Sequence, residues 1–120
     1  MFINLSNHPS SQWSEAQTEA ARRYGDIIDM PFPIVSPQAN EDEVEALADE
    51  YRQKVLDLAQ GQPVTVHVMG EMTFTVSLVL KLHETGISSV ASTTLRVVSE
   101  SSNGVKQSFF KFIKFRKYLP

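Results

Sequence analysis

The alternation of short apolar runs with helical patterns is the feature that most constrains how this sequence can fold. The runs are rich in β-branched residues and end in turn-forming residues, which is typical of strands. Between them, apolar residues recur with the spacing of one helical face. The predicted strands are residues 2–6, 26–30, 63–69 and 87–91, and the predicted helices are residues 13–24, 40–58 and 71–84. This order predicts parallel strands joined by crossover helices.

The end of the chain carries a different signal. Residues 94–100 and 105–118 have the composition of two further strands, and the Asn-Gly pair in residues 101–104 between them is typical of a tight hairpin. We therefore expect an α/β fold of three layers, with a mostly parallel sheet and a C-terminal antiparallel β-hairpin. The 120 residues fit a single domain that spans residues 1–120.

Composition excludes several classes of protein. The sequence has no cysteine, which excludes a disulfide framework, a thiolate metal site and a cysteine nucleophile. No stretch approaches the roughly 20 apolar residues of a membrane-spanning helix, and no secretory leader is visible. We therefore expect a soluble, cytoplasmic protein that does not engage a membrane.

Charge is unevenly distributed, although the net charge is only −3. Acidic side chains dominate residues 41–57, whereas every charged side chain from Val105 onward is basic. Two interpretations of the basic segment remain open: an edge strand that lysines protect from aggregation, or a ribbon that attracts a polyanion. The overall charge gives no support for binding duplex DNA.

Polar residues concentrate where this fold predicts a crevice, since ligands of parallel sheets bind beyond the carboxyl ends of the strands. Segments 7–11, 69–75 and 92–96 each follow a predicted strand and should meet at that edge. The candidate ligand-binding residues there are Asn7, Ser10, Ser11, Gly70, Thr73, Thr93 and Thr94. Gly70 and Thr73 also have ordinary structural interpretations, as a tight turn and a helix cap.

Three side chains in the same segments are candidates for catalysis. Histidine side chains titrate near neutral pH, so His8 suits proton transfer, although loop histidines without a catalytic role are commoner. Glu71 either acts as a base or contacts a ribose, or it only favours the positive end of a helix dipole. Arg96 follows three hydroxyl residues and suits a phosphate, with a surface ion pair as the alternative.

Familiar motifs are missing. The chain has neither of the glycine-rich fingerprints for dinucleotides and triphosphates, and it lacks G-x-S-x-G and H-E-x-x-H. His67 lies in a predicted strand and His83 near the end of a predicted helix, so we interpret both as structural. The histidines share no metal-ligand spacing, and we expect no bound metal and no cofactor. The residues alone thus predict a polar crevice suited to an anion, without an identifiable nucleophile.

The stretches Asn-His-Pro at 7–9 and Met-Gly-Glu-Met-Thr at 69–73, together with the terminal hairpin, resemble small stand-alone CRISPR-associated proteins. These have a Rossmann-like, CARF-type fold and are of the ring-nuclease kind. The resemblance implies a homodimer in antiviral defence that binds cyclic oligoadenylate at the strand ends and cleaves it without metal. A ribose 2′-hydroxyl would attack the adjacent phosphate, held by Arg96 and the Gly70 backbone, while His8 assists proton transfer.

The same resemblance distributes the candidates around the ligand. It places His8, Ser10 and Ser11 near the ligand, Gly70, Glu71 and Thr73 at a contacting helix start, and Thr93, Thr94 and Arg96 on the opposite wall. The chain departs from larger CARF proteins because it lacks a T-G-G-T-K stretch and an appended effector domain.

Two further expectations come from the residues themselves. The absence of a spaced catalytic set favours an alternative function, a non-catalytic module that binds a nucleotide or a protein. A third candidate, a generic Rossmann-like nucleotide- or sugar-modifying enzyme, conflicts with the missing glycine fingerprint. The segment 108–118 is apolar on both faces of a strand, which predicts that a second subunit covers one of them in a homodimer.

Overall fold

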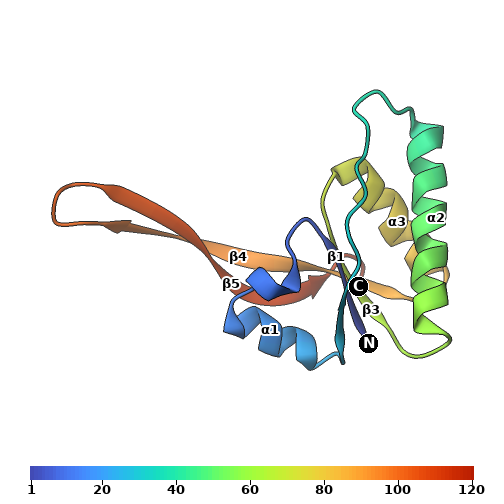
Figure 1. Ribbon diagram of the computed structural model, residues 1–120, viewed down its shortest axis with the longest axis horizontal. Coiled ribbons are helices and arrows are strands. Elements are labelled where there is room, and N and C mark those ends of the chain that lie inside the picture. Colours follow the sequence, from blue (N-terminus) through green and yellow to red (C-terminus); the bar gives the residue numbers. More distant parts are fainter.

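The computed structural model describes all residues from 1 to 120 and contains one sheet with helices on both faces (Figure 1). The strands lie in the order β2-β1-β3-β4-β5, and only the β4–β5 pair is antiparallel. The elements are β1 (Phe2–Ser6), the short 3-10 turn η1 (Ser10–Gln12), α1 (Glu15–Arg22), β2 (Ile27–Asp29), α2 (Glu41–Ala59), β3 (Thr65–Met69), α3 (Met72–Glu84), β4 (Ser88–Glu100) and β5 (Lys106–Lys117). The predicted α/β fold, with its mostly parallel sheet and C-terminal hairpin, is confirmed.

Alternation along the central strands divides the core into two layers. Ile3 and Leu5 of β1 pack with Val66 and Val68 of β3 beneath α2 and α3, where all four are fully buried. Phe2 faces the other way and packs near α1. Because strand side chains alternate between faces, Asn4, Ser6 and His67 also belong to the α1 side. A set of buried polar groups therefore lies under α1, whereas the α2–α3 side is apolar.

Local sequence explains where the helices begin and end. The Ser14 hydroxyl accepts a hydrogen bond from the Gln17 backbone N–H at the start of α1. The Glu43 carboxylate accepts one from the Asn40 N–H, which completes a capping box at the start of α2. Helix α2 ends in a left-handed residue, Gln60, followed by Gly61 at φ +78°. None of the helices combines the length and apolar character needed to cross a membrane.

The structure corrects the prediction in two places. Segments 87–91 and 94–100 are not separate strands, since β4 runs without a break from Ser88 to Glu100. The segment 92–96, which was expected to follow the strand, is therefore part of β4, and its residues pair with β5. The first predicted helix is also shorter, because Trp13 lies between η1 and α1 and packs against the core instead.

The long β4–β5 hairpin leaves the body of the molecule as a projecting arm, here defined as residues 95–111 (Figure 1). Its pairing is interrupted between Thr93 and Thr94, where Ile113 of β5 has no partner. This β-bulge adds one residue to β5 and so places Phe110 and Phe112 on the same face as Phe115, which regular alternation would not do. Several apolar side chains of the arm are exposed, and Phe110 is the most exposed of them at 70%.

Candidate functional site

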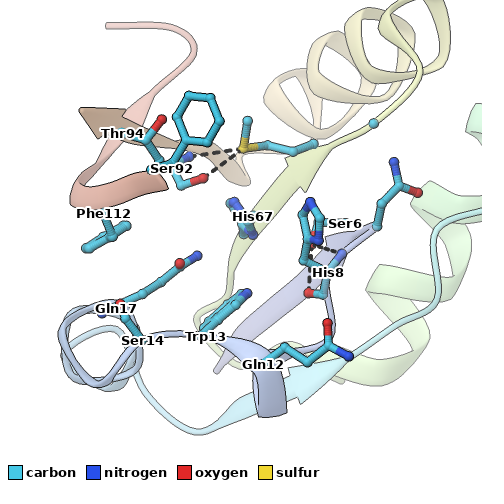
Figure 2. A pocket seen from close by; sticks show the side chains of 14 residues that line it. Ser6, His8, Gln12, Trp13, Ser14, Gln17, His67, Ser92, Thr94 and Phe112 are labelled. Atoms are coloured by element: carbon cyan, nitrogen blue, oxygen red, sulfur yellow. Dashed lines mark hydrogen bonds between the residues drawn. The ribbon is translucent and has the colours of Figure 1, made fainter. Parts of the chain in front are cut away.

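A pocket of about 600 Å³ opens between α1, the carboxyl ends of β1 and β3, and the root of the arm. Figure 2 shows side chains from all of these elements pointing toward one space. Its lining consists of Ser6, Asn7, His8, Gln12, Trp13, Ser14, Gln17, His67, Met69, Gly70, Ser92, Thr94, Phe110 and Phe112. Its volume lies within the range of roughly 300–1,000 Å³ that is typical of small-molecule sites.

A buried hydrogen-bond network lies beneath the pocket. The Asn4 side-chain amide donates to the His8 carbonyl at 2.8 Å and to the Asp29 carboxylate at 2.9 Å. The Ser6 hydroxyl lies 2.8 Å from Asn4 Oδ1, and His67 Nδ1 lies 2.9 Å from the same oxygen. The network ties β1, β2 and β3 together at the edge of the sheet and holds the loop that carries His8.

This network fixes the protonation of His67. Both neighbours of the Asn4 amide nitrogen are acceptors, which assigns Oδ1 to the side that faces His67. Because that oxygen only accepts, His67 Nδ1 must carry the proton and donate it. In the neutral ring, Nε2 is then an acceptor with a free lone pair. No partner for Nε2 exists in the structure.

Aromatic rings surround His67. Its ring stacks on Phe2 and meets Trp13 and Phe115 edge-on, with ring centres 6.2, 5.6 and 5.3 Å away. The residue is 2% exposed. Burial, together with a smaller effect of the nearby His8, lowers the pKa of His67 to about 4. His67 is therefore a neutral acceptor at physiological pH.

The walls above this floor carry no charged side chain. Trp13, Phe112 of β5 and the arm residue Phe110 contribute aromatic surface, while Gln12 and Gln17 contribute amides. On the opposite rim, the Ser92 hydroxyl donates to the Met69 sulfur at 2.9 Å. Such a lining offers stacking faces and hydrogen-bonding groups, which suits a flat, polar but uncharged moiety.

The predicted ligand-binding residues divide into two groups. Asn7, Gly70 and Thr94 line the pocket, as does the catalytic candidate His8. The other ligand-binding candidates lie outside its lining, as do the two remaining catalytic candidates: Ser10, Ser11, Thr73 and Thr93, and Glu71 and Arg96. The structure thus brings the three predicted segments to one edge but gathers only part of their side chains.

Several of the outlying candidates are engaged in the fold itself. Ser10 donates through its hydroxyl to Asp29 at 2.9 Å. Although partial burial acts to raise it, the pKa of Asp29 is lowered because Asn4 and Ser10 donate to its carboxylate. Thr93 donates to the Lys114 carbonyl across the hairpin, and Ser11 lines a separate depression beside Arg22.

Glu71 caps its own helix. Its carboxylate accepts hydrogen bonds from the backbone N–H groups of Thr73 and Phe74 and from the Thr73 hydroxyl. The Thr73 hydroxyl and these backbone donors lower the pKa of Glu71. The first free N–H groups of α3, which the sequence suggested for an anion, are therefore occupied by a side chain of the same turn.

Gly70 owes its identity to a close approach. A β-carbon at this position would lie 2.2 Å from the ring of Phe32, well inside contact distance. The Phe32 ring in turn packs edge-on against Phe74 at the start of α3. Glycine is therefore required at this position by the nearby ring and not by a positive φ, and Gly70 still contributes backbone to the pocket.

Arg96 lies on the arm, paired with Phe110 and on the same strand face as Thr94. Successive residues on one strand face are separated by about 7 Å. The guanidinium group therefore belongs to the mouth of the pocket and to the arm rather than to the pocket floor.

Sequence reasoning missed the residues that form most of the site. His67 was assigned a structural role, and Trp13 was assigned to a helix. The alternation of Val66, His67 and Val68 did place the histidine on the face opposite the two valines. Nothing in the sequence indicated that the arm would rise over that face and complete a pocket.

The chain matches the model of the uncharacterized protein MJ1673 family over residues 1–116. It belongs to this family. The matched range of the MJ1673 family includes every residue of the pocket and the whole arm. Neither the curated proteins nor the solved structures contain a match to the chain.

Proposed function

We propose that this protein binds a nucleotide, with the base in the pocket, and that the ligand is a cyclic oligoadenylate. The observation that carries the proposal is the lining itself: aromatic rings and amides at the carboxyl ends of parallel strands, with no charge inside. Cyclic oligoadenylate comes from the resemblance of the chain to small CRISPR-associated proteins.

The lining fits a nucleobase better than a phosphate. Every base has a π-face that stacks on aromatic side chains, and stacking contributes about 1–3 kcal/mol per base. Trp13 and Phe112 supply such faces on two sides of the pocket. Gln12, Gln17 and Asn7 supply amides, which pair with the donor and acceptor edges of a base.

With the base in the pocket, the phosphates of the ligand would contact the arm. Arg96 lies beside the mouth of the pocket, and the charged side chains of β5 are all basic. A guanidinium group holds a phosphate in a fork of two hydrogen bonds. This arrangement leaves the base inside and the phosphodiester outside, where a ring of several nucleotides has room to continue.

A second copy of the chain would share such a ligand. A pocket of about 600 Å³ accommodates one part of a cyclic oligonucleotide but not the whole ring. The exposed apolar residues of the arm favour the same arrangement, because a two-stranded hairpin is only marginally stable in water unless something covers it. We therefore propose a homodimer in which the arms cover each other and the two pockets share one ring.

Binding rather than cleavage is the function that the geometry of a single chain supports. Of the three catalytic candidates, only His8 lines the pocket. Glu71 is engaged as a helix cap and Arg96 lies on the arm. This distribution favours the non-catalytic alternative, a nucleotide-binding module, over a ring nuclease.

The test uses Trp13, which is the only tryptophan of the chain and lines the pocket. Titration with cyclic tri-, tetra- and hexa-adenylate should change its fluorescence and saturate. The Gln17→Ala variant should weaken binding, whereas Gln53→Ala on the exposed face of α2 should not. Chromatography of the same mixtures in EDTA should show intact rings. Failure of every ring to bind would remove the proposal, and linear products would establish a ring nuclease.

A further inference from the structure

One buried group in the site has no partner. His67 Nε2 is closed off from solvent and makes no hydrogen bond, although the ring belongs to the pocket lining. The neighbouring polar side chains of Asn4 and Ser6 are both hydrogen-bonded. A buried acceptor without a donor is costly, and in native proteins such exceptions call for a reason.

The network beneath the pocket keeps that acceptor open. Asn4 Oδ1 accepts a hydrogen bond from the protonated Nδ1 of His67. The Asp29 carboxylate accepts one from the Asn4 amide nitrogen and so holds the Asn4 side chain in the orientation that this requires. Rotation of the ring by half a turn would replace Nδ1 by the carbon Cδ2 against Asn4 Oδ1 and lose the hydrogen bond. Phe2 and Phe115 pack against the ring and hold its plane.

We propose that His67 is the residue that recognises the ligand, by accepting at Nε2 a hydrogen bond from an N–H or O–H donor of the ligand. This inference rests on the proposed nucleotide-binding function of the pocket. On a nucleotide, the donor is either the exocyclic amine of adenine or a ribose hydroxyl. A phosphate is not a partner, because a neutral nitrogen lone pair repels an anion.

Recognition involves Trp13. Its ring meets the His67 ring edge-on, and Trp13 is only partly buried. A ligand reaches Nε2 when the Trp13 ring moves aside and stacks on the base. Binding is selective as a result, because a site with a buried acceptor rejects analogues that lack the matching donor.

His8 and His67 thus have different roles in the same pocket. His8 is exposed on the loop after β1 and lines the pocket from there. His67 is held neutral by burial, which lowers its pKa to about 4, so its acceptor stays available throughout the physiological range. His67 acts on the ligand as a hydrogen-bond acceptor and transfers no proton.

Nitrogen-15 NMR of the histidine side chains tests the assignment on the unaltered protein. The free chain should show His67 with its proton on Nδ1 and an unprotonated Nε2. Saturation with cyclic tetra-adenylate should move the Nε2 resonance upfield, as expected for an acceptor that gains a donor, and leave the tautomer unchanged. A proton on Nε2 in the free chain, or an Nε2 resonance that saturating ligand leaves unmoved, would overturn the inference.

A variant pair tests the energetic claim by calorimetry. His67→Phe preserves the aromatic packing, removes the acceptor, and should bind cyclic tetra-adenylate about tenfold or more weakly. His83→Phe, at the exposed end of α3, is the matched control and should bind as the unaltered chain does. Inosine and 2′-deoxyadenosine monophosphates, compared with adenosine monophosphate, identify which donor is read. Equal binding by His67→Phe would overturn this inference alone, whereas no binding by the unaltered chain would remove the proposed function with it.

Discussion

At the scale of single residues, the site depends on polar groups that are buried against aromatic rings. Thr65, His67 and Met69 alternate with Val66 and Val68, so the sequence alone places the histidine on the less apolar face of β3. Its contacts with Asn4 could not be predicted, because that pairing depends on the register between β1 and β3. Long-range register is set by the whole sheet and leaves no local signal.

Stability should fall in mild acid because of His67. Its pKa is lowered from 6.5 in the unfolded chain to about 4 in the folded one, so below pH 6.5 the unfolded state binds more protons. Its contribution, about 3 kcal/mol, is complete above pH 6.5 and is lost as the pH falls toward 4. Urea unfolding between pH 7.5 and 4.5 measures it.

The His67→Phe variant provides the control for this acid effect. It should lose most of the pH dependence in that window, because the ordinary pKa values of aspartate and glutamate lie below it and those of Asp29 and Glu71 are lowered further. His8 remains in the variant as an exposed histidine. An unchanged pH dependence in His67→Phe would show that another group is responsible.

Gly70→Ala should destabilise the protein by about 1–3 kcal/mol, because the added carbon would overlap the Phe32 ring. Thermal unfolding followed by circular dichroism measures the loss. Phe32→Leu should cost stability on its own but should reduce the penalty of Gly70→Ala when the two are combined. Strictly additive effects would mean that the glycine is needed for another reason.

At the scale of elements, the helices were the easiest to predict and the long strands the hardest. The capping box at Asn40 and the Ser14 cap each involve residues within one turn, so the helix starts depend on local sequence. Phe110, Phe112 and Phe115 are not evenly spaced, and in a regular strand they would divide between two faces. The bulge at Ile113 gathers them on one face. Some of the apolar residues of segment 108–118 that the sequence assigned to two faces therefore lie on one face, where they contact the core and the pocket.

The start of α3 tests whether Glu71 has more than a structural role. Glu71→Ala removes the acceptor for two backbone N–H groups and should cost about 1 kcal/mol of stability, measured by urea unfolding. Its affinity for cyclic tetra-adenylate should stay within twofold of the unaltered chain. Glu71→Gln, which keeps a side-chain oxygen, should recover part of the stability. A large loss of affinity in both variants would show that Glu71 contributes to ligand binding.

At the scale of the whole molecule, the arm is what departs most from a simple layered fold. The longest extent of the chain is 52 Å, and the arm lies along that direction in Figure 1. Val98 lies on the same strand face as Phe110 and is 57% exposed. The homodimer predicted from the sequence and the proposed pairing of the arms both depend on this face.

Val98→Lys should therefore convert a dimer into a monomer at micromolar concentration, as measured by light scattering after size exclusion. Leu80→Lys, an equally apolar position exposed on α3, should remain dimeric. Replacing residues 97–109 by Asn-Gly, so that a two-residue turn joins Arg96 to Phe110, should give a folded monomer. A monomer before any substitution would count against the pairing of the arms.

Phe110 belongs to two surfaces at once, since it lines the pocket and stands on the exposed face of the arm. Whatever fills the pocket and whatever covers the arm must therefore compete for, or cooperate through, the same ring. Such sharing makes the two binding free energies thermodynamically linked, and linkage is reciprocal. If the ligand tightens the association of two chains by some factor, the separated chains bind the ligand more weakly by the same factor. Dilution that separates the chains therefore lowers the affinity for the ligand. The concentration of the protein itself would then set how much ligand it retains.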